Sequence, residues 1–119
     1  MIGPNWADFA AEWCAAWNAR DVERVLAHFH DDAVFTSPLA AQRVPESGGT
    51  VRGKAALRAY WTGGVRAVPD LHFTIEGVFG GVDMVTILYR NQAGIRVTET
   101  LRFDGAKVRE GHAAYEAAV

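Results

Sequence analysis

Glu99 is the residue whose position most clearly suggests chemistry. It lies in an alternating run whose apolar members share one side: Ile95, Val97, Leu101 and Phe103. A carboxylate that faces a core must be neutralised, paired or hydrated, and each of these shifts its pKa in a way that acid/base chemistry can use. Full burial raises the pKa of a carboxyl by as much as roughly 3 to 5 units. The pattern therefore predicts a carboxyl group that acts as an acid, a base or a hydrogen-bond donor.

Two other interpretations of Glu99 remain open at this point. It can form a structural ion pair with Arg90 or Arg102, or the alternation can be broken so that Glu99 faces water. Arg90 is also a candidate ligand-binding residue, and its position depends on the hairpin register. A two-residue loop at Ala93 and Gly94 puts Arg90 and Glu99 on one face of the sheet, whereas a three-residue loop puts them on opposite faces.

His72 and His112 are candidate partners for Glu99 in proton transfer. Both fall on segments that alternate like strands, and an imidazole titrates near neutral pH, which suits a proton shuttle. The alternative is that both are solvated surface residues. We therefore predict a catalytic group of Glu99, His112 and His72, with the surface position of the histidines as the competing hypothesis.

The segment His28, His30, Asp31 and Asp32 contains ligand types that suit zinc or iron. Residues two apart on a helix point about 200° apart, so the two histidines cannot easily close on one ion. The segment is more typical of a helix end followed by a turn. We expect no metal site and no cofactor.

Aromatic side chains on inward faces form a candidate ligand-binding set, together with one hydroxyl at a strand end. The set consists of Trp13, Trp17, Phe35, Tyr60, Trp61 and Ser37. The alternative is that the aromatic residues simply fill the core. Ser37 has no nucleophile elbow around it, and its alternative role is to bond to nearby backbone.

Helical spacing predicts three helices in the first half of the chain. The first covers residues 6–17 with Asn5 as N-cap, the second follows Asp21 and runs to Phe29, and the third runs from Lys54 to Pro69. Residues 33–37 are predicted to form a short strand. Residues 38–49 are predicted to form a loop. The overlapping segment of residues 40–50 is either a mobile flap over the pocket mouth or a tolerant surface loop.

The second half alternates in four segments, residues 71–76, 85–89, 95–103 and 108–115, separated by glycine-rich turns. This pattern predicts an antiparallel meander. Helices that precede a curved antiparallel sheet make an α+β domain in which the helices cover one sheet face. A chain of 119 residues is expected to form one domain, residues 1–119.

Composition excludes several function classes. Half of the residues are hydrophobic and the net charge is -2, so the sequence has no electrostatic footprint for nucleic acid or for an anionic membrane. Cys14 is the one cysteine, and the first residues lack a secretion signal. We expect a cytoplasmic protein that binds neither nucleic acid nor membranes.

Four separated phrases resemble the NTF2-like superfamily, and within it the SnoaL-like polyketide cyclase and ketosteroid isomerase branch. They are WCAAWNARD from Trp13, LAHFHDDAVF from Leu26, GKAAL from Gly53 and LRFDGAKV from Leu101. The resemblance implies a cone-shaped sheet around a deep apolar pocket, usually in a homodimer. The resemblance does not indicate one activity, because this fold hosts isomerases, cyclases, dehydratases, epoxide hydrolases and non-enzymatic binding domains.

The resemblance transfers only part of the isomerase chemistry. The position of the family's Asp base falls on Ser37 before Pro38, the oxyanion-hole tyrosine falls on Trp13, and the second donor falls on Glu99. In the polyketide cyclase branch, an acidic residue on a late strand acts beside pocket histidines. The sequence thus predicts a pocket for a small hydrophobic molecule, with cofactor-free isomerase, cyclase or dehydratase chemistry at Glu99. The alternative is a non-catalytic ligand-binding or dimerisation module.

Overall fold

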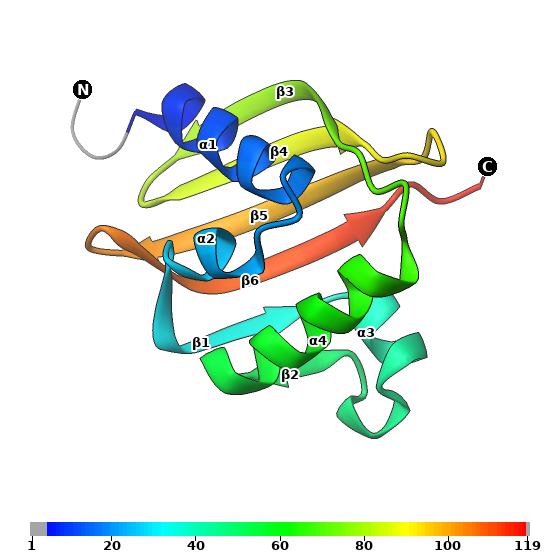
Figure 1. The fold of residues 1–119 in the computed structure, drawn as a ribbon. Helices are drawn as coiled ribbons and strands as arrows, with labels where there is room; N and C mark the ends of the chain where they lie inside the picture. The colour runs from blue at the N-terminus through cyan, green and yellow to red at the C-terminus, as the bar shows by residue number, and fades with distance from the viewer. Residues whose placement is uncertain (1–4, 119) are drawn as a thin grey trace.

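The computed structural model of the chain describes residues 5–118. Six strands form one sheet, in the order β2-β1-β6-β5-β4-β3, and the longer helices lie together on one of its faces (Figure 1). This arrangement confirms the predicted α+β class. The prediction of a single domain over residues 1–119 includes five residues, 1–4 and 119, that lie outside the described part.

Two of the predicted helices begin where their caps place them. In α1 (Trp6–Asn18) the Asn5 side chain accepts a hydrogen bond from the backbone N–H of Asp8, and in α2 (Val22–Leu26) Asp21 caps the first turn in the same way. The predicted extension of α2 to Phe29 is wrong. Phe29 is buried and starts the first strand, because β-pairing with β6 begins at this residue.

The segment predicted to be a loop contains a helix. Helix α3 (Pro38–Arg43) begins directly after Ser37, which caps it. The Ser37 hydroxyl accepts a hydrogen bond from the N–H of Leu39 at 3.1 Å. Pro38 is the first residue of this capped helix, a position where a proline lacks only an N–H that would have no partner in the helix. The predicted loop over residues 38–49 is therefore wrong for residues 38–43. The short 3-10 turn η1 (Pro45–Ser47) and strand β2 (Thr50–Arg52) come next, and α4 (Lys54–Ala67) agrees with the predicted third helix.

The remaining five strands build most of the sheet. They are β1 (Phe29–Thr36), β3 (Thr74–Gly81), β4 (Met84–Arg90), β5 (Arg96–Asp104) and β6 (Lys107–Tyr115). Strands β3 to β6 form the predicted antiparallel meander. The pairing of β1 with β6 is parallel, so the sheet is not antiparallel throughout. Register shifts in three of the strand pairs bend the sheet.

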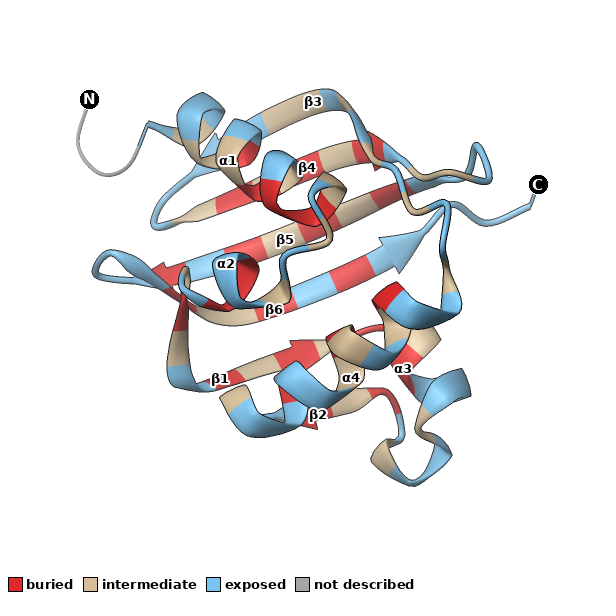
Figure 2. Cartoon of the chain, viewed as in Figure 1, coloured by how far each residue is buried: buried red, intermediate tan, exposed pale blue. Residues whose placement is uncertain are grey.

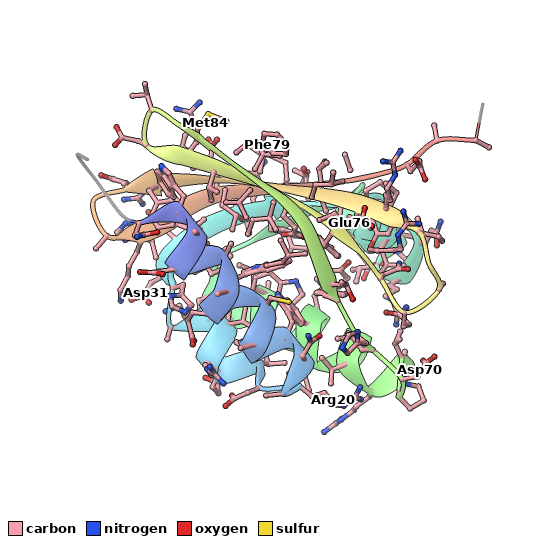
Figure 3. The ribbon with its side chains drawn as sticks, turned by 90° about the horizontal axis from the view of Figure 1, so that it is seen from above. Arg20, Asp31, Asp70, Glu76, Phe79 and Met84 are labelled. Atoms are coloured by element: carbon pink, nitrogen blue, oxygen red, sulfur yellow. The ribbon has the colours of Figure 1, made fainter. Side chains whose placement is uncertain are left out.

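The sheet has an inner face, covered by α1, α2 and α4, and an outer face. Figure 3 shows α1 on one side of the strands and the labelled Phe79 and Met84 on the other. Buried residues follow alternate positions along β4 and β5 and the sheet-facing sides of the helices (Figure 2). The core therefore lies between the helices and the inner face.

One end of this core is filled by side chains. Trp6 and Phe9 of α1 meet Phe103 edge to face, with ring centroids 5.2 and 5.0 Å apart, and Leu101 beside them is fully buried. We call these four residues the packed end.

No helix in residues 5–118 has the length and apolar character required to cross a membrane.

Candidate functional site

Glu99 lies on the inner face of the sheet, near the middle of β5. It is paired across the ladders with Ile87 of β4 and Ala113 of β6, and its neighbours on the same face of β5 are buried. Its own exposed fraction is only 8%. The period of the strand thus carries the carboxyl inward, as the alternation predicted.

Among residues 5–118, one side chain forms a hydrogen bond with the Glu99 carboxyl. The hydroxyl of Tyr89 donates to Oε1 of Glu99 at 3.2 Å. Burial raises the pKa of Glu99 to about 8, and the hydrogen bond from Tyr89 opposes this rise in part. Burial and the nearby carboxyl also hold the pKa of Tyr89 well above its usual value. Glu99 is therefore mostly protonated at pH 7, and a neutral carboxyl has a proton to donate.

A cavity of about 270 Å³ adjoins this pair. Its apolar wall comes from both layers of the fold, namely Trp17, Phe35, Leu39, Trp61, Val65, Val68, Leu71, Phe73, Ile95 and Ala113. Its polar members are Ser37, Arg43, Tyr60, Tyr89, Asn91, Gln92, Glu99 and Tyr115. An apolar cavity with a few convergent polar groups is the usual form of a small-molecule site.

Trp61 of α4 is the centre of the aromatic wall. Its ring meets Trp17, Phe29 and Phe35 edge to face, with centroids 5.2 to 5.4 Å apart. These contacts fix the ring orientations, since each ring is held by rings from other elements. The wall is therefore largely preformed.

Two further tyrosines bring hydroxyls to the cavity. Burial raises the pKa of Tyr60, and it raises the pKa of Tyr115 to about 12. The charge of Glu99 adds to both shifts, while Ser37 and the charge of Arg43 act in the opposite direction. Both phenols are neutral at pH 7, and so they can donate or accept hydrogen bonds without carrying charge.

Six of the predicted site residues line the same cavity: Trp17, Phe35, Ser37, Tyr60, Trp61 and Glu99. Trp13 does not line it. Trp13 is 1% exposed, and its ring contacts both Phe73 and Tyr89. The core interpretation therefore describes Trp13, whereas Trp17, one turn later on α1, lies in the cavity wall.

Arg90 lies apart from the site. The N–H of Asn91 donates to the carbonyl of Ile95 at 2.9 Å, and Arg90 pairs with Arg96, so residues 92–94 form the three-residue loop that was one of the two alternatives. This register places Arg90 and Glu99 on opposite faces. Nε of Arg90 donates to Glu76 at 2.9 Å, so the ion pair of Arg90 with Glu99 is not formed.

The two histidines are also separated from Glu99. His112 lies on the outer face of β6, half exposed, with Nδ1 2.7 Å from the hydroxyl of Thr36. His72 precedes β3 and is exposed. Neither lines the cavity, so the predicted grouping of Glu99 with His112 or His72 is wrong: residue 113, not 112, lies opposite Glu99 in the ladder.

Polar residues of the cavity that were not predicted from the sequence include Tyr89, Tyr115, Arg43 and Gln92. Tyr89 carried a usable signal, because a tyrosine on the inward side of an apolar strand needs a partner for its hydroxyl. No local pattern indicated the other three of these residues, Tyr115, Arg43 and Gln92. Their approach to the cavity depends on how β6, α3 and the β4–β5 loop meet. Among residues 5–118, no three histidine, cysteine or acidic side chains come together in a way that could hold a metal ion.

The fold is that of an NTF2-like or cystatin-like α+β protein, and solved structures with these two descriptions match the chain over most of its length. Residues 10–116 match the SnoaL-like domain family. The chain belongs to this family.

Three solved structures show the range of its relatives. A SnoaL-like protein of unknown function from Burkholderia thailandensis is 37% identical, with a TM-score of 0.89 and 93% of each chain covered. AclR from Streptomyces galilaeus, proposed to be a hydroxylase, is 23% identical with a TM-score of 0.71, covering 92% of this chain and 87% of AclR. A Sinorhizobium meliloti protein proposed to be a polyketide cyclase is 12% identical with a TM-score of 0.75, covering 90% and 94%. A comparison with curated proteins gives no significant match.

Proposed function

We propose that this protein binds a small, largely apolar molecule in the cavity and that Glu99 handles a proton in cofactor-free chemistry on it. The observation that carries the proposal is the buried carboxyl at the cavity wall, which is bonded to Tyr89 and, in the described part of the chain, to no cationic side chain. A buried carboxyl that a salt bridge does not neutralise is costly, so it is expected where its proton is used.

The protonation state of Glu99 favours a specific role. With a pKa of about 8, the group donates a proton or a hydrogen bond at neutral pH, and its conjugate base can take a proton back. Among the described residues that line the cavity there is no second carboxyl and no histidine. One group must therefore serve both steps, which suits isomerisation, cyclisation or dehydration next to a carbonyl, where a proton leaves one atom and returns to another.

The test of catalysis compares the parent with Glu99→Gln on a substrate that needs such a transfer. A β,γ-unsaturated cyclic ketone is a suitable probe, because its conjugation is followed directly by absorbance. Loss of a general acid or base is expected to lower kcat by roughly 10² to 10⁴-fold. Unchanged turnover in Glu99→Gln would exclude the proposed role of this residue.

The second candidate is a non-catalytic ligand-binding module. It is favoured by the separation of both histidines from Glu99, which leaves the cavity without a conventional base. On this hypothesis Glu99→Gln binds the same molecule with full affinity, and the parent never transforms it. Isothermal titration together with product analysis separates the two candidates.

The expected homodimer is carried forward as a proposal. The outer face exposes Phe79, whose side chain points away from the helices (Figure 3), and Leu88 and Thr86 lie next to it across the β3–β4 ladder. If a second copy covers this face, Phe79→Ser weakens self-association in sedimentation equilibrium and leaves ligand binding unchanged. A parent protein that sediments as a monomer at high micromolar concentration excludes the homodimer.

A further inference from the structure

The polar groups of the cavity are not spread evenly, and their distribution bears on the ligand. Glu99 and Tyr89 belong to the middle of the sheet, whereas Arg43 ends α3 and Gln92 lies in the β4–β5 loop. Figure 1 shows α3, the β4–β5 loop and the end of β6 at the same end of the molecule. We call this end, with Arg43, Gln92 and Tyr115, the mouth of the cavity.

Arg43 is the one cationic side chain among the described residues of the cavity lining. In residues 5–118 no carboxylate lies within ion-pair distance of its guanidinium, whereas Arg24, Arg58 and Arg96 each bind a glutamate. An arginine presents a planar fork that matches the two oxygens of a carboxylate. The mouth thus offers a free site for an anionic group.

Gln92 provides an independent observation. The Oε1 atom of its side chain is buried and has no hydrogen-bond partner among the described residues. A buried amide oxygen only accepts hydrogen bonds, so a hydroxyl or N–H donor of a ligand would satisfy it and a carboxylate would not. The polar part of the ligand is therefore expected at the mouth, with its apolar part inside.

The interior is compatible with an anion at the mouth. Its wall is built from aromatic rings such as Trp17, Trp61 and Phe73, which suit a flat apolar body. Glu99 is mostly neutral at pH 7, so it does not repel a negative group. Tyr60 and Tyr115 line the same cavity as Arg43 and Glu99.

We infer that the cavity takes a hydrophobic carboxylate, an aromatic or alicyclic acid whose ring system packs against Trp17 and Trp61 while its carboxylate binds Arg43 at the mouth. This inference rests on the proposed binding function and names the class of its ligand. The volume of about 270 Å³ is near the lower end of ligand pockets, at about 300 Å³, and it suits a body of one or two fused rings.

The test uses two probes of equal shape, 2-naphthoate and its neutral amide 2-naphthamide, titrated into the full chain by calorimetry at pH 7. We expect the parent to bind the carboxylate about fivefold more tightly than the amide, the size of effect that one partly exposed ion pair supplies. In Arg43→Gln this ratio is expected to fall to about one. Because Arg43 is exposed, the variant should fold like the parent, which circular dichroism checks.

Arg66→Gln is the matched control. Arg66 is an exposed arginine in the last turn of α4 and does not line the cavity, so its replacement removes the same charge and should keep the fivefold ratio. Arg43→Lys keeps the positive charge without the planar guanidinium, so it should keep part of the preference for the carboxylate probe.

The outcomes separate the inference from the proposed function. Equal affinities for the two probes in the parent, or a ratio that survives in Arg43→Gln, overturn the inferred ligand class while binding in the cavity stands. Binding of neither probe overturns both. A ratio that falls equally in Arg43→Gln and Arg66→Gln reflects net charge alone, and it also overturns the inference.

Discussion

The two ends of the inner sheet face are built from similar residues and differ in what they enclose. At the packed end the rings of Trp6 and Phe9 pack edge to face on Phe103. Trp17 and Phe35 pack on Trp61 in the same way, yet all three line the cavity. Aromatic content therefore does not decide whether a region is filled.

Polar side chains mark the difference. At the packed end the inner face carries only apolar residues, and the charged groups there, such as Glu12 and Arg24, pair on the surface. Around the cavity Glu99, Tyr89 and Tyr60 face inward. A polar group can face inward only where water, a ligand or another polar group satisfies it, so inward polar residues locate the site.

The largest expected effect is on packing. Leu101→Ala at the packed end leaves a void and should lower the free energy of unfolding by about 2 to 5 kcal/mol. Leu39→Ala, in the cavity wall and only half-buried, enlarges space that already exists and should cost about 1 kcal/mol. Urea unfolding with constant m-value measures both. Equal losses would contradict the distinction between the two ends.

The next effect is on the pH dependence of stability. In the folded protein the Glu99 carboxyl keeps its proton up to about pH 8, whereas in the unfolded chain the carboxyl loses this proton near pH 4.5. Between these values the unfolded state binds fewer protons, so the parent loses stability as the pH rises, by up to about 1.4 kcal/mol per unit. Below pH 4.5 this loss is absent.

Glu99→Gln should remove that loss and be more stable than the parent at pH 9. Denaturant titrations at pH 5, 7 and 9 measure it. Glu46→Gln, which removes an exposed carboxyl on η1, is the matched control and should follow the parent. Identical slopes for the parent and Glu99→Gln would show that water reaches the carboxyl freely.

A smaller effect is expected from Tyr89→Phe. The variant removes the hydrogen bond to Oε1 of Glu99, which should cost about 1 kcal/mol of stability. Because that bond favours the carboxylate, the pKa of Glu99 should rise further above 8. Carbon-detected NMR titration of the Glu99 carboxyl measures the change. A lower pKa in the variant would mean that the phenol does not donate to this group.

The smallest effect belongs to the surface of the packed end. Hydrogen bonding to Arg24 lowers the pKa of Glu12 to about 2, the opposite direction to Glu99. The stability that the pair of Glu12 and Arg24 contributes is present above pH 4.5 and is lost as the pH falls toward 2. Since the pair is exposed, Glu12→Gln should cost below about 1 kcal/mol at pH 7. Thermal unfolding at pH 7 and pH 3 checks it, and a loss above 2 kcal/mol would contradict a surface role.

Local patterns predicted the elements well where one signal acted alone. The caps Asn5 and Asp21 set the starts of α1 and α2, and alternation set the inward side of β5. Prediction failed at Pro38, where a turn signal and a helix N1 signal use the same residue, and at β2, which is too short to show a period. Such segments are decided by what they pack against.

The sequence by itself determined that Glu99 faces the core, because side-chain direction in a strand has a period of two that the backbone imposes locally. It also determined which aromatic residues point inward. Only the tertiary structure decided the partners of that carboxyl. Tyr89 rather than Arg90, and Ala113 rather than His112, lie beside it because a three-residue loop at residues 92–94 and long-range pairing with β6 set the registers. A cavity is likewise a property of elements brought together from the whole chain, so no local pattern contains it.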